Sequence, residues 1–108
     1  MKKGEIWLIK LPEKGGKEQT GIRPGLIISN TKTGMIITIP ITSNIQALKF
    51  PHTIEVKKSN ENGLEKDSIL LIFQMQSLDK NRFIHKIGVL DEDCMKNVNE
   101  IIKTLIEI

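Results

Sequence analysis

The chain has 108 residues, enough for one domain with a single hydrophobic core. Its 16 Lys and Arg side chains against 13 Asp and Glu give a formal net charge of +3, which permits a polyanionic partner without requiring one. One cysteine excludes an internal disulfide, no apolar run approaches the ~20 residues that span a membrane, and the N-terminus does not resemble a signal peptide. Three Phe, one Trp and no Tyr argue against an aromatic platform for nucleobases. We therefore expect one cytoplasmic domain over residues 1–108, with no membrane contact.

The first half of the chain predicts three strands. Residues 4–11 are rich in β-forming side chains, and residues 26–28 form a short apolar run typical of a strand buried on both faces. Residues 35–42 have the apolar density of a third strand, in which Pro40 argues for an edge or a strand end. Residues 13–22 are too polar for the core and predict a mobile loop.

The second half predicts a helical turn followed by three more strands. The turn covers residues 43–50, and an alternating strand covers residues 52–57. Residues 69–73 form a second apolar run that predicts a buried strand. Residues 82–90 predict a strand with a bend at Gly88.

One helix is predicted, at the end of the chain. Asp91 is placed as its N-cap. The apolar residues that follow recur at helical spacing, namely Met95, Val98, Ile101, Ile102, Leu105 and Ile106. The expected fold is therefore mainly β (α+β): a compact, mostly antiparallel β-barrel closed by a C-terminal α-helix.

Patterns for metals and cofactors do not occur in the sequence. His52 and His85 are far apart, and no CxxC, HExxH or GxxxxGK[ST] pattern is present. We expect no metal and no cofactor. A nucleophilic pair of Cys94 and a histidine stays open, although near a helix start a small buried hydrophobe is the commoner role for cysteine.

Polar residues follow or precede several of the predicted strands. Arg23 lies before Pro24, which favours extended backbone, so it opens a strand. Thr42 and Ser43 close another strand, and Gln74 follows a third. Strand ends gather on the rim of a barrel, and an arginine fork beside hydroxyl groups suits a phosphodiester. The alternative for a lone arginine is a solvated surface charge.

Four ordered motifs carry a resemblance to a known family. They are "GIRPGLIISN", "IPITSNIQALKFPH", "GLEKDSILLIFQ" and "GVLDEDCMKNVNEIIKTL". In this order and spacing the chain resembles the MazF/PemK toxin endoribonucleases of bacterial toxin–antitoxin systems over nearly its whole length. The resemblance implies an SH3-like barrel of the CcdB/PemK type and a homodimer. It also implies metal-independent, sequence-specific cleavage of single-stranded messenger RNA, and inhibition by a cognate MazE-like antitoxin.

The resemblance assigns roles to single residues. Arg23 corresponds to the arginine that acts at the scissile phosphate, and Thr42 corresponds to the threonine of the family's "ITS" motif. The general base is unassigned, because a neutral threonine is a poor base and a lone histidine at a strand start is more often structural. Gln76 stands where the family often has an arginine, so a second positive charge is missing there. The residues that we expect to contact RNA are Lys17, Glu18, Gln19, Ser43, His52, Gln74 and Gln76.

Two other functions stay open at this stage. One is a non-catalytic CcdB-like toxin that inhibits DNA gyrase, and the other is an inactive RNA-binding barrel, which Gln76 favours. For the antitoxin we expect an acidic, disordered peptide on a rim that presents Arg23 with Lys14, Lys17 and Lys49. The apolar residues 101–108 favour a homodimer, although the same face could simply close the barrel.

Overall fold

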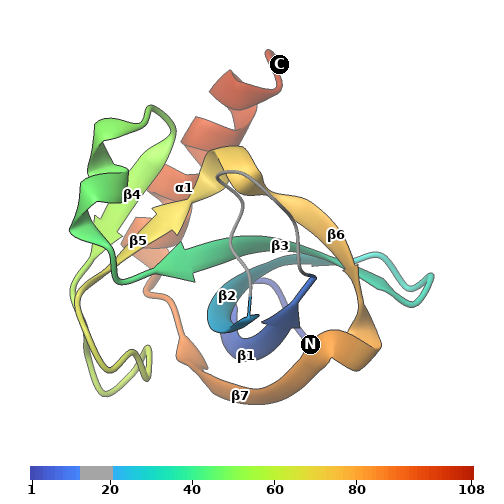
Figure 1. The fold of residues 1–108 in the computed structure, drawn as a ribbon. Helices are drawn as coiled ribbons and strands as arrows, with labels where there is room; N and C mark the ends of the chain where they lie inside the picture. Colours follow the sequence, from blue (N-terminus) through green and yellow to red (C-terminus); the bar gives the residue numbers. More distant parts are fainter. Residues whose placement is uncertain (13–20) are drawn as a thin grey trace.

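The computed structural model describes residues 1–12 and 21–108, and their main feature is one curved antiparallel sheet (Figure 1). Three short 3₁₀ helices also occur in this part of the chain, η1 (Ile45–Lys49), η2 (Ile72–Gln74) and η3 (Lys80–Arg82), with one α-helix, α1 (Glu92–Leu105). The strands are β1 (Glu5–Leu11), β2 (Gly21–Asn30), β3 (Met35–Thr42), β4 (Thr53–Val56), β5 (Ser68–Leu71), β6 (Gln76–Asp79) and β7 (Phe83–Val89).

The strand order is β4-β5-β3-β2-β1-β7, and β6 also pairs with β3. On the side away from β2, β3 pairs first with β6, up to Thr38, and then with β5, from Ile41. Pro40 lies at this change of partner, in neither the β6 nor the β5 ladder. The strand predicted over residues 35–42 is confirmed as β3. The expectation that Pro40 marks an edge or a strand end is wrong, because β3 lies between β2 and β5 and continues to Thr42.

In the described parts of the chain, hydrogen bonds do not close the sheet into a barrel. Within the described residues, no ladder joins β7 at one edge to β4 or β6. The sheet is nevertheless strongly curved, and β6 and β7 continue around β1 and β2 in Figure 1. A mainly antiparallel β fold with one C-terminal helix is confirmed, while the closed barrel is not shown.

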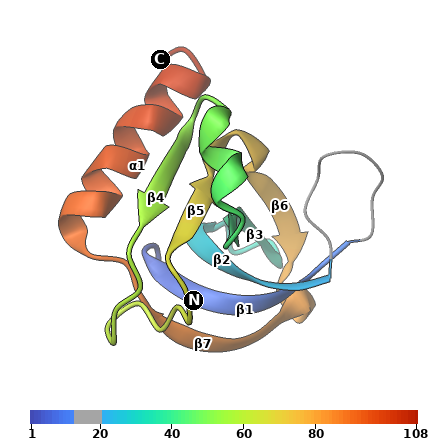
Figure 2. The ribbon, with the colours of Figure 1, turned by 60° about the vertical axis from the view of Figure 1, so that its left-hand side comes forward.

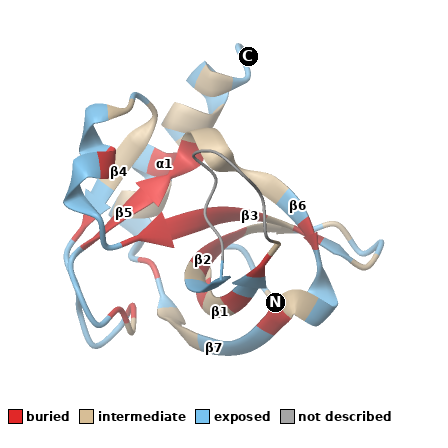
Figure 3. Cartoon of the chain, in the orientation of Figure 1, coloured by how far each residue is buried: buried red, intermediate tan, exposed pale blue. Residues whose placement is uncertain are grey.

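The core has two main parts, one on each face of the sheet. Neighbouring residues of β2 contribute to both parts of the core. Leu26 belongs to one cluster and Ile27 to the other, and neither has exposed surface. This confirms the strand buried on both faces, and Figure 3 shows that β3 and β5 are also largely buried. The cluster toward α1 includes Ile6, Leu26, Ile39, Leu70, Ile72 and Val98, and the other consists of Ile9, Leu11, Ile27, Ile36, Leu78 and Phe83.

The predicted helix forms and covers one side of the sheet beside β4 (Figure 2). A carboxylate oxygen of Asp91 accepts a hydrogen bond from the backbone N–H of Cys94 at 3.1 Å, which confirms the N-cap. Val98 is fully buried against the sheet. No helix in the described part of the chain is long and apolar enough to cross a membrane.

The chain turns earlier after β5 than the sequence predicts. The expected strand over residues 69–73 ends at Leu71, and Ile72–Gln74 form the 3₁₀ helix η2. The next strand, β6, was not predicted, because it has four residues and only Leu78 among them is buried. The early turn at η2 directs Phe73 and Gln74 toward the pocket described next.

Candidate functional site

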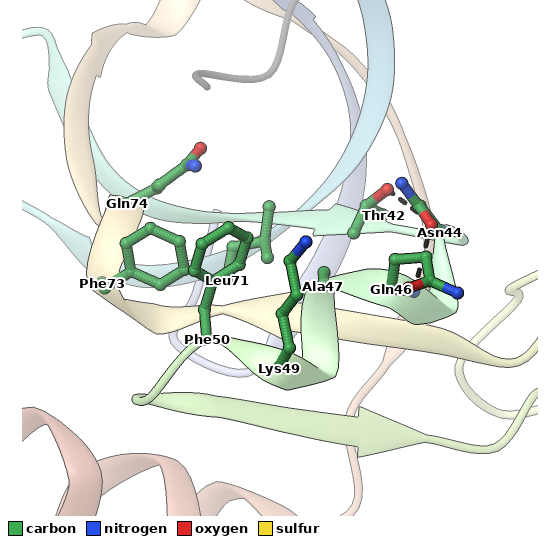
Figure 4. Close-up of a pocket in the computed structure, with 9 residues that line it drawn as sticks. All are labelled: Thr42, Asn44, Gln46, Ala47, Lys49, Phe50, Leu71, Phe73 and Gln74. Atoms are coloured by element: carbon green, nitrogen blue, oxygen red, sulfur yellow. Dashed lines mark hydrogen bonds between the residues drawn. The ribbon is translucent and has the colours of Figure 1, made fainter. Parts of the chain in front are cut away.

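A pocket of about 200 Å³ lies where the end of β3 and the helix η1 meet the end of β5 and the helix η2 (Figure 4). Hydroxyl and amide groups, one ammonium group and two phenyl rings line it. The residues are Thr42, Asn44, Gln46, Ala47, Lys49, Phe50, Leu71, Phe73 and Gln74.

The polar side of the pocket is built by local hydrogen bonds after β3. The hydroxyl oxygen of Thr42 accepts a hydrogen bond from the backbone N–H of Asn44 at 3.2 Å, and the side chain is 8% exposed. Asn44 is the N-cap of η1, because its carboxamide oxygen accepts from the N–H of Gln46 at 3.0 Å. The Thr42 hydroxyl thus has a defined position, and its proton can donate to a ligand.

The floor of the pocket is aromatic and apolar. The rings of Phe50 and Phe73 lie 5.5 Å apart between centroids, tilted by 46°. Phe73 packs on a small buried cluster of Ala47, Ile69 and Leu71. Two of the three phenylalanines therefore meet at one site.

Lys49 brings a positive charge to the same pocket. Its ammonium nitrogen lies 5.6 Å from the centroid of the Phe50 ring, within the range of a cation–π contact. In the view of Figure 4 the side chain extends from η1 between Phe50 and Thr42. The side chain is exposed, so its charge is open to a ligand that approaches from solvent.

Arg23 lies near the start of β2 and is exposed. Its guanidinium donates a hydrogen bond to the carbonyl of Ile22 at 3.0 Å. The last β2–β3 pair is Gly25 with Pro40, so Arg23 near the start of β2 and Thr42 at the end of β3 both lie two residues beyond it. Thr42 itself pairs with Ile69 of β5. The two candidate catalytic residues thus lie at the same end of neighbouring antiparallel strands. Arg23 is not among the described residues that line the pocket.

The other expected site residues are spread over the surroundings. Gln74 lines the pocket, Ser43 is exposed directly after β3, and Gln76 is half-buried on β6 opposite Thr38. His52 is half-buried and has a left-handed backbone with φ of 59°, and its carbonyl accepts from the N–H of Ile72. Outside the described residues lie Lys14, Lys17, Glu18 and Gln19.

Asn44, Gln46, Phe50 and Phe73 were missed as site residues, and Lys49 was expected only on the rim. Phe50 and Phe73 are far apart in the sequence, and the β4–β5 pairing brings them together, with Thr53 opposite Leu71. A usable signal was Asn44, since an Asn directly before a helical turn is a favoured N-cap.

The groups that could support other chemistry lie elsewhere. Cys94 is half-buried in the first turn of α1, where burial raises the pKa of the thiol and the Asp91 carboxylate raises it further. A thiol in that environment stays protonated near neutral pH and is a poor nucleophile. Across residues 1–12 and 21–108, no group of three His, Cys, Asp or Glu side chains is placed to hold a metal ion.

Comparisons with known proteins cover nearly the whole chain. Residues 2–106 match the family model for the PemK-like, MazF-like toxin of type II toxin–antitoxin system. The chain is 40% identical to Endoribonuclease MazF of Staphylococcus saprophyticus, over 94% of this chain and 88% of that protein.

Solved structures share the fold. MazF of Deinococcus radiodurans superposes with a TM-score of 0.81 at 22% identity, over 98% of this chain and 96% of that one. An endoribonuclease in complex with its cognate antitoxin from a mycobacterial species has a TM-score of 0.74 at 18% identity, over 98% and 94%. Because the family model and the relative from S. saprophyticus both match almost all of the sequence, the chain belongs to the PemK-like, MazF-like toxin family of type II toxin–antitoxin systems.

Proposed function

We propose that this protein is an endoribonuclease toxin that cleaves single-stranded messenger RNA in the cytoplasm without a metal ion and at specific short sequences. Family membership and the name of the relative from S. saprophyticus, Endoribonuclease MazF, support RNA cleavage. The structural observation that carries the proposal is the placement of Arg23 and Thr42 at the same end of neighbouring strands, with Thr42 in the wall of the polar and aromatic pocket. The likeness to MazF structures supports an SH3-like barrel as the scaffold.

The proposed reaction uses the RNA itself as nucleophile. The 2′-oxygen attacks the neighbouring phosphorus while the bond to the 5′-oxygen breaks, which leaves a 2′,3′-cyclic phosphate and a 5′-hydroxyl. The 2′-hydroxyl loses its proton to a base that we leave unassigned, and the leaving 5′-oxygen gains a proton. Negative charge increases on the phosphoryl oxygens in the transition state. The Arg23 guanidinium, which stays protonated, stabilises that charge, and the Thr42 hydroxyl orients the phosphate.

Cleavage is expected to continue in excess EDTA. Purified protein incubated with mixed-sequence RNA should give a limited set of fragments, each ending in a 2′,3′-cyclic phosphate, because the proposed residues supply the charge that a metal ion would otherwise supply. End mapping by sequencing measures both the product ends and the specificity. Arg23→Ala protein purified in the same way controls for contaminating nucleases.

Three results would contradict this proposal. Cleavage that stops in EDTA and returns with Mg²⁺ would show a metal-dependent nuclease. RNA binding without any cleavage would favour the inactive barrel. Intact RNA together with trapped gyrase–DNA cleavage complexes would favour the CcdB-like inhibitor.

We also propose that an antitoxin neutralises the toxin by covering the rim at Arg23 and Lys49. The mycobacterial neighbour in complex with its cognate antitoxin supports a protein partner of this kind. Exposed cationic side chains favour an acidic, MazE-like segment that orders on binding.

A homodimer is the proposed solution state. Ile106 is 50% exposed and Ile108 is 83% exposed at the end of the chain, where a second copy could cover them. Light scattering at micromolar concentration is expected to give about twice the chain mass of 12.2 kDa. Replacing both isoleucines by Ser should shift the mass toward one chain. A wild-type mass of one chain would reject the dimer.

A further inference from the structure

We propose that Asn62 is a latent site of deamidation, which the folded turn over residues 57–67 protects and which becomes reactive when that turn opens. After the reaction the turn cannot regain its native contacts, so a molecule that has opened is destabilised irreversibly. Asn62 precedes Gly63, and the sequence contains no other Asn-Gly pair. Neither residue is among the described residues that line the pocket, so the modification does not depend on RNA cleavage.

The reaction needs only these two residues and water. The backbone nitrogen of Gly63 attacks the side-chain carbonyl carbon of Asn62, and the bond from that carbon to the amide nitrogen breaks. Ammonia leaves with the proton that the Gly63 nitrogen gives up, and a cyclic succinimide remains. Water then breaks one of the two C–N bonds of the ring, which gives either aspartate or isoaspartate. Gly63 favours ring closure because it has no side chain to hinder the attack.

The folded turn holds each group that takes part in the reaction. The N–H of Gly63 donates to the carbonyl of Ser59 at 3.1 Å, so the attacking nitrogen is engaged. The carboxamide oxygen of Asn62 accepts from the N–H groups of Ser59 and Leu64, each at 3.0 Å. The NH₂ group of Asn62 donates to the carbonyl of Lys57 at 2.9 Å. Since Asn62 is also only 5% exposed, ring closure requires the turn to open first.

Neither product can restore the contacts of Asn62. Aspartate has an oxygen in place of the NH₂ donor, so two acceptors would face each other where Asn62 now donates to Lys57. It also brings a negative charge to a buried position. Isoaspartate lengthens the backbone, and the turn has no room for this, since a Cβ built on Gly88 would lie 2.3 Å from the backbone carbonyl carbon of Asn62. The modified turn would therefore separate from β7.

The turn joins two paired strands, which determines what the modification affects. Val56 of β4 pairs with Ser68 of β5 next to the turn, whereas Thr53 pairs with Leu71 at the other end of the ladder, near the pocket. Loss of the turn should weaken the first of these ends. We therefore expect deamidation to lower the stability of the domain without acting directly on the residues of the candidate site.

The first test compares deamidation in folded and unfolded protein. Wild type is incubated at mildly alkaline pH with and without guanidinium chloride, and peptide mapping by mass spectrometry measures aspartate and isoaspartate at Asn62 over time. The folded protein should react roughly 100-fold or more slowly, because four hydrogen bonds hold the reacting groups and each contributes roughly a factor of 2 to 13. Asn60, exposed in the same turn, is the internal control and should differ much less. Equal rates at Asn62 in both conditions would overturn the proposal.

A second test opens the turn without changing the Asn-Gly pair. Ser59→Ala removes the hydroxyl oxygen that accepts from the backbone N–H of Asn62 at 3.1 Å. Without denaturant, this variant should deamidate roughly 2- to 13-fold faster than wild type, the effect of one hydrogen bond. Ser77→Ala, exposed on β6, is the matched control and should react at the wild-type rate. A Ser59→Ala protein that is folded by circular dichroism and reacts no faster than this control would overturn the requirement for opening.

The third test measures the effect of the product. Asn62→Asp should melt roughly 4–24 °C below wild type, because a buried acceptor loses its donor. Asn60→Asp makes the same change at an exposed position of the turn and should melt like wild type. Deamidated wild type provides a second readout, since after dilution from denaturant it should refold to a smaller native fraction than unmodified protein. An Asn62→Asp protein that melts at the wild-type temperature would overturn the irreversible step.

Discussion

Arg23→Ala is expected to lower the cleavage rate by a factor on the order of 100 to 1,000, the scale on which enzymes lose activity when one preorganised transition-state donor is removed. The loss should appear in the single-turnover rate at saturating enzyme, because the charge develops at the phosphate in the transition state. Arg23→Lys should recover only part of the rate, since an ammonium group cannot provide a bidentate fork.

The chain offers a matched control for this substitution. Arg82 on η3 also donates a guanidinium hydrogen bond to a backbone carbonyl, that of Lys10 at 3.3 Å, as Arg23 does to Ile22 at 3.0 Å. Arg82→Ala removes the same charge from another place on the sheet and should leave the rate near that of wild type. Because Arg23 is exposed, its loss should not change the melting temperature. An Arg23→Ala protein that cleaves at full rate would remove this residue from the mechanism and leave it as a solvated charge.

Gly63→Ala is expected to be the most destabilising of the single substitutions considered. Gly63 has φ of +69°, and a Cβ built on it would lie 1.9 Å from the carbonyl oxygen of Ile87. An alanine there is strained in its backbone conformation and also clashes with the backbone of β7, which cannot rotate away as a side chain can. Folding would require the turn to separate from β7.

Gly34→Ala is the matched control for the clash. Gly34 also has a left-handed backbone, with φ of +90°, but a Cβ on it meets nothing within 4 Å. The Gly34→Ala substitution should lower the free energy of unfolding only by this conformational strain, about 1–2 kcal/mol. Gly63→Ala should lower the free energy of unfolding by clearly more, because the clash adds to the strain. Each kcal/mol of lost stability lowers the melting temperature by about 4–8 °C in a domain near this size. Equal melting temperatures for the two variants would show that the contact between Gly63 and Ile87 is not close.

The surroundings explain why this turn has so little freedom. The Asn62 side chain is 5% exposed, and its carboxamide oxygen accepts from the N–H groups of Ser59 and Leu64, each at 3.0 Å. Its NH₂ group donates to the carbonyl of Lys57 at 2.9 Å. The turn therefore has a fixed shape and fits against an irregularity of β7, where Ile6 pairs with Gly88 but Trp7 pairs with Lys86. The bend that the sequence predicts at Gly88 is confirmed by this shift in register.

Local signals in the sequence were sufficient for most of the elements. The helix and its Asp91 cap, the strand β2 and the strand β3 follow from periodicity, capping and Pro/Gly punctuation, which act over a few residues. The same local signals predict Arg23 and Thr42 at strand ends. The antiparallel β2–β3 pairing then places these ends together.

Only the tertiary structure decided how the pocket is assembled. Phe50 and Phe73 meet because β4 pairs with β5, and that register depends on side chains distant in the sequence. The early end of β5 at Leu71 and the short strand β6 likewise depend on β3, which changes its partner at Pro40. The amino-acid composition gives the number of aromatic residues but not their positions in space. The few that this chain has can therefore form a site once long-range strand pairing brings them next to Lys49.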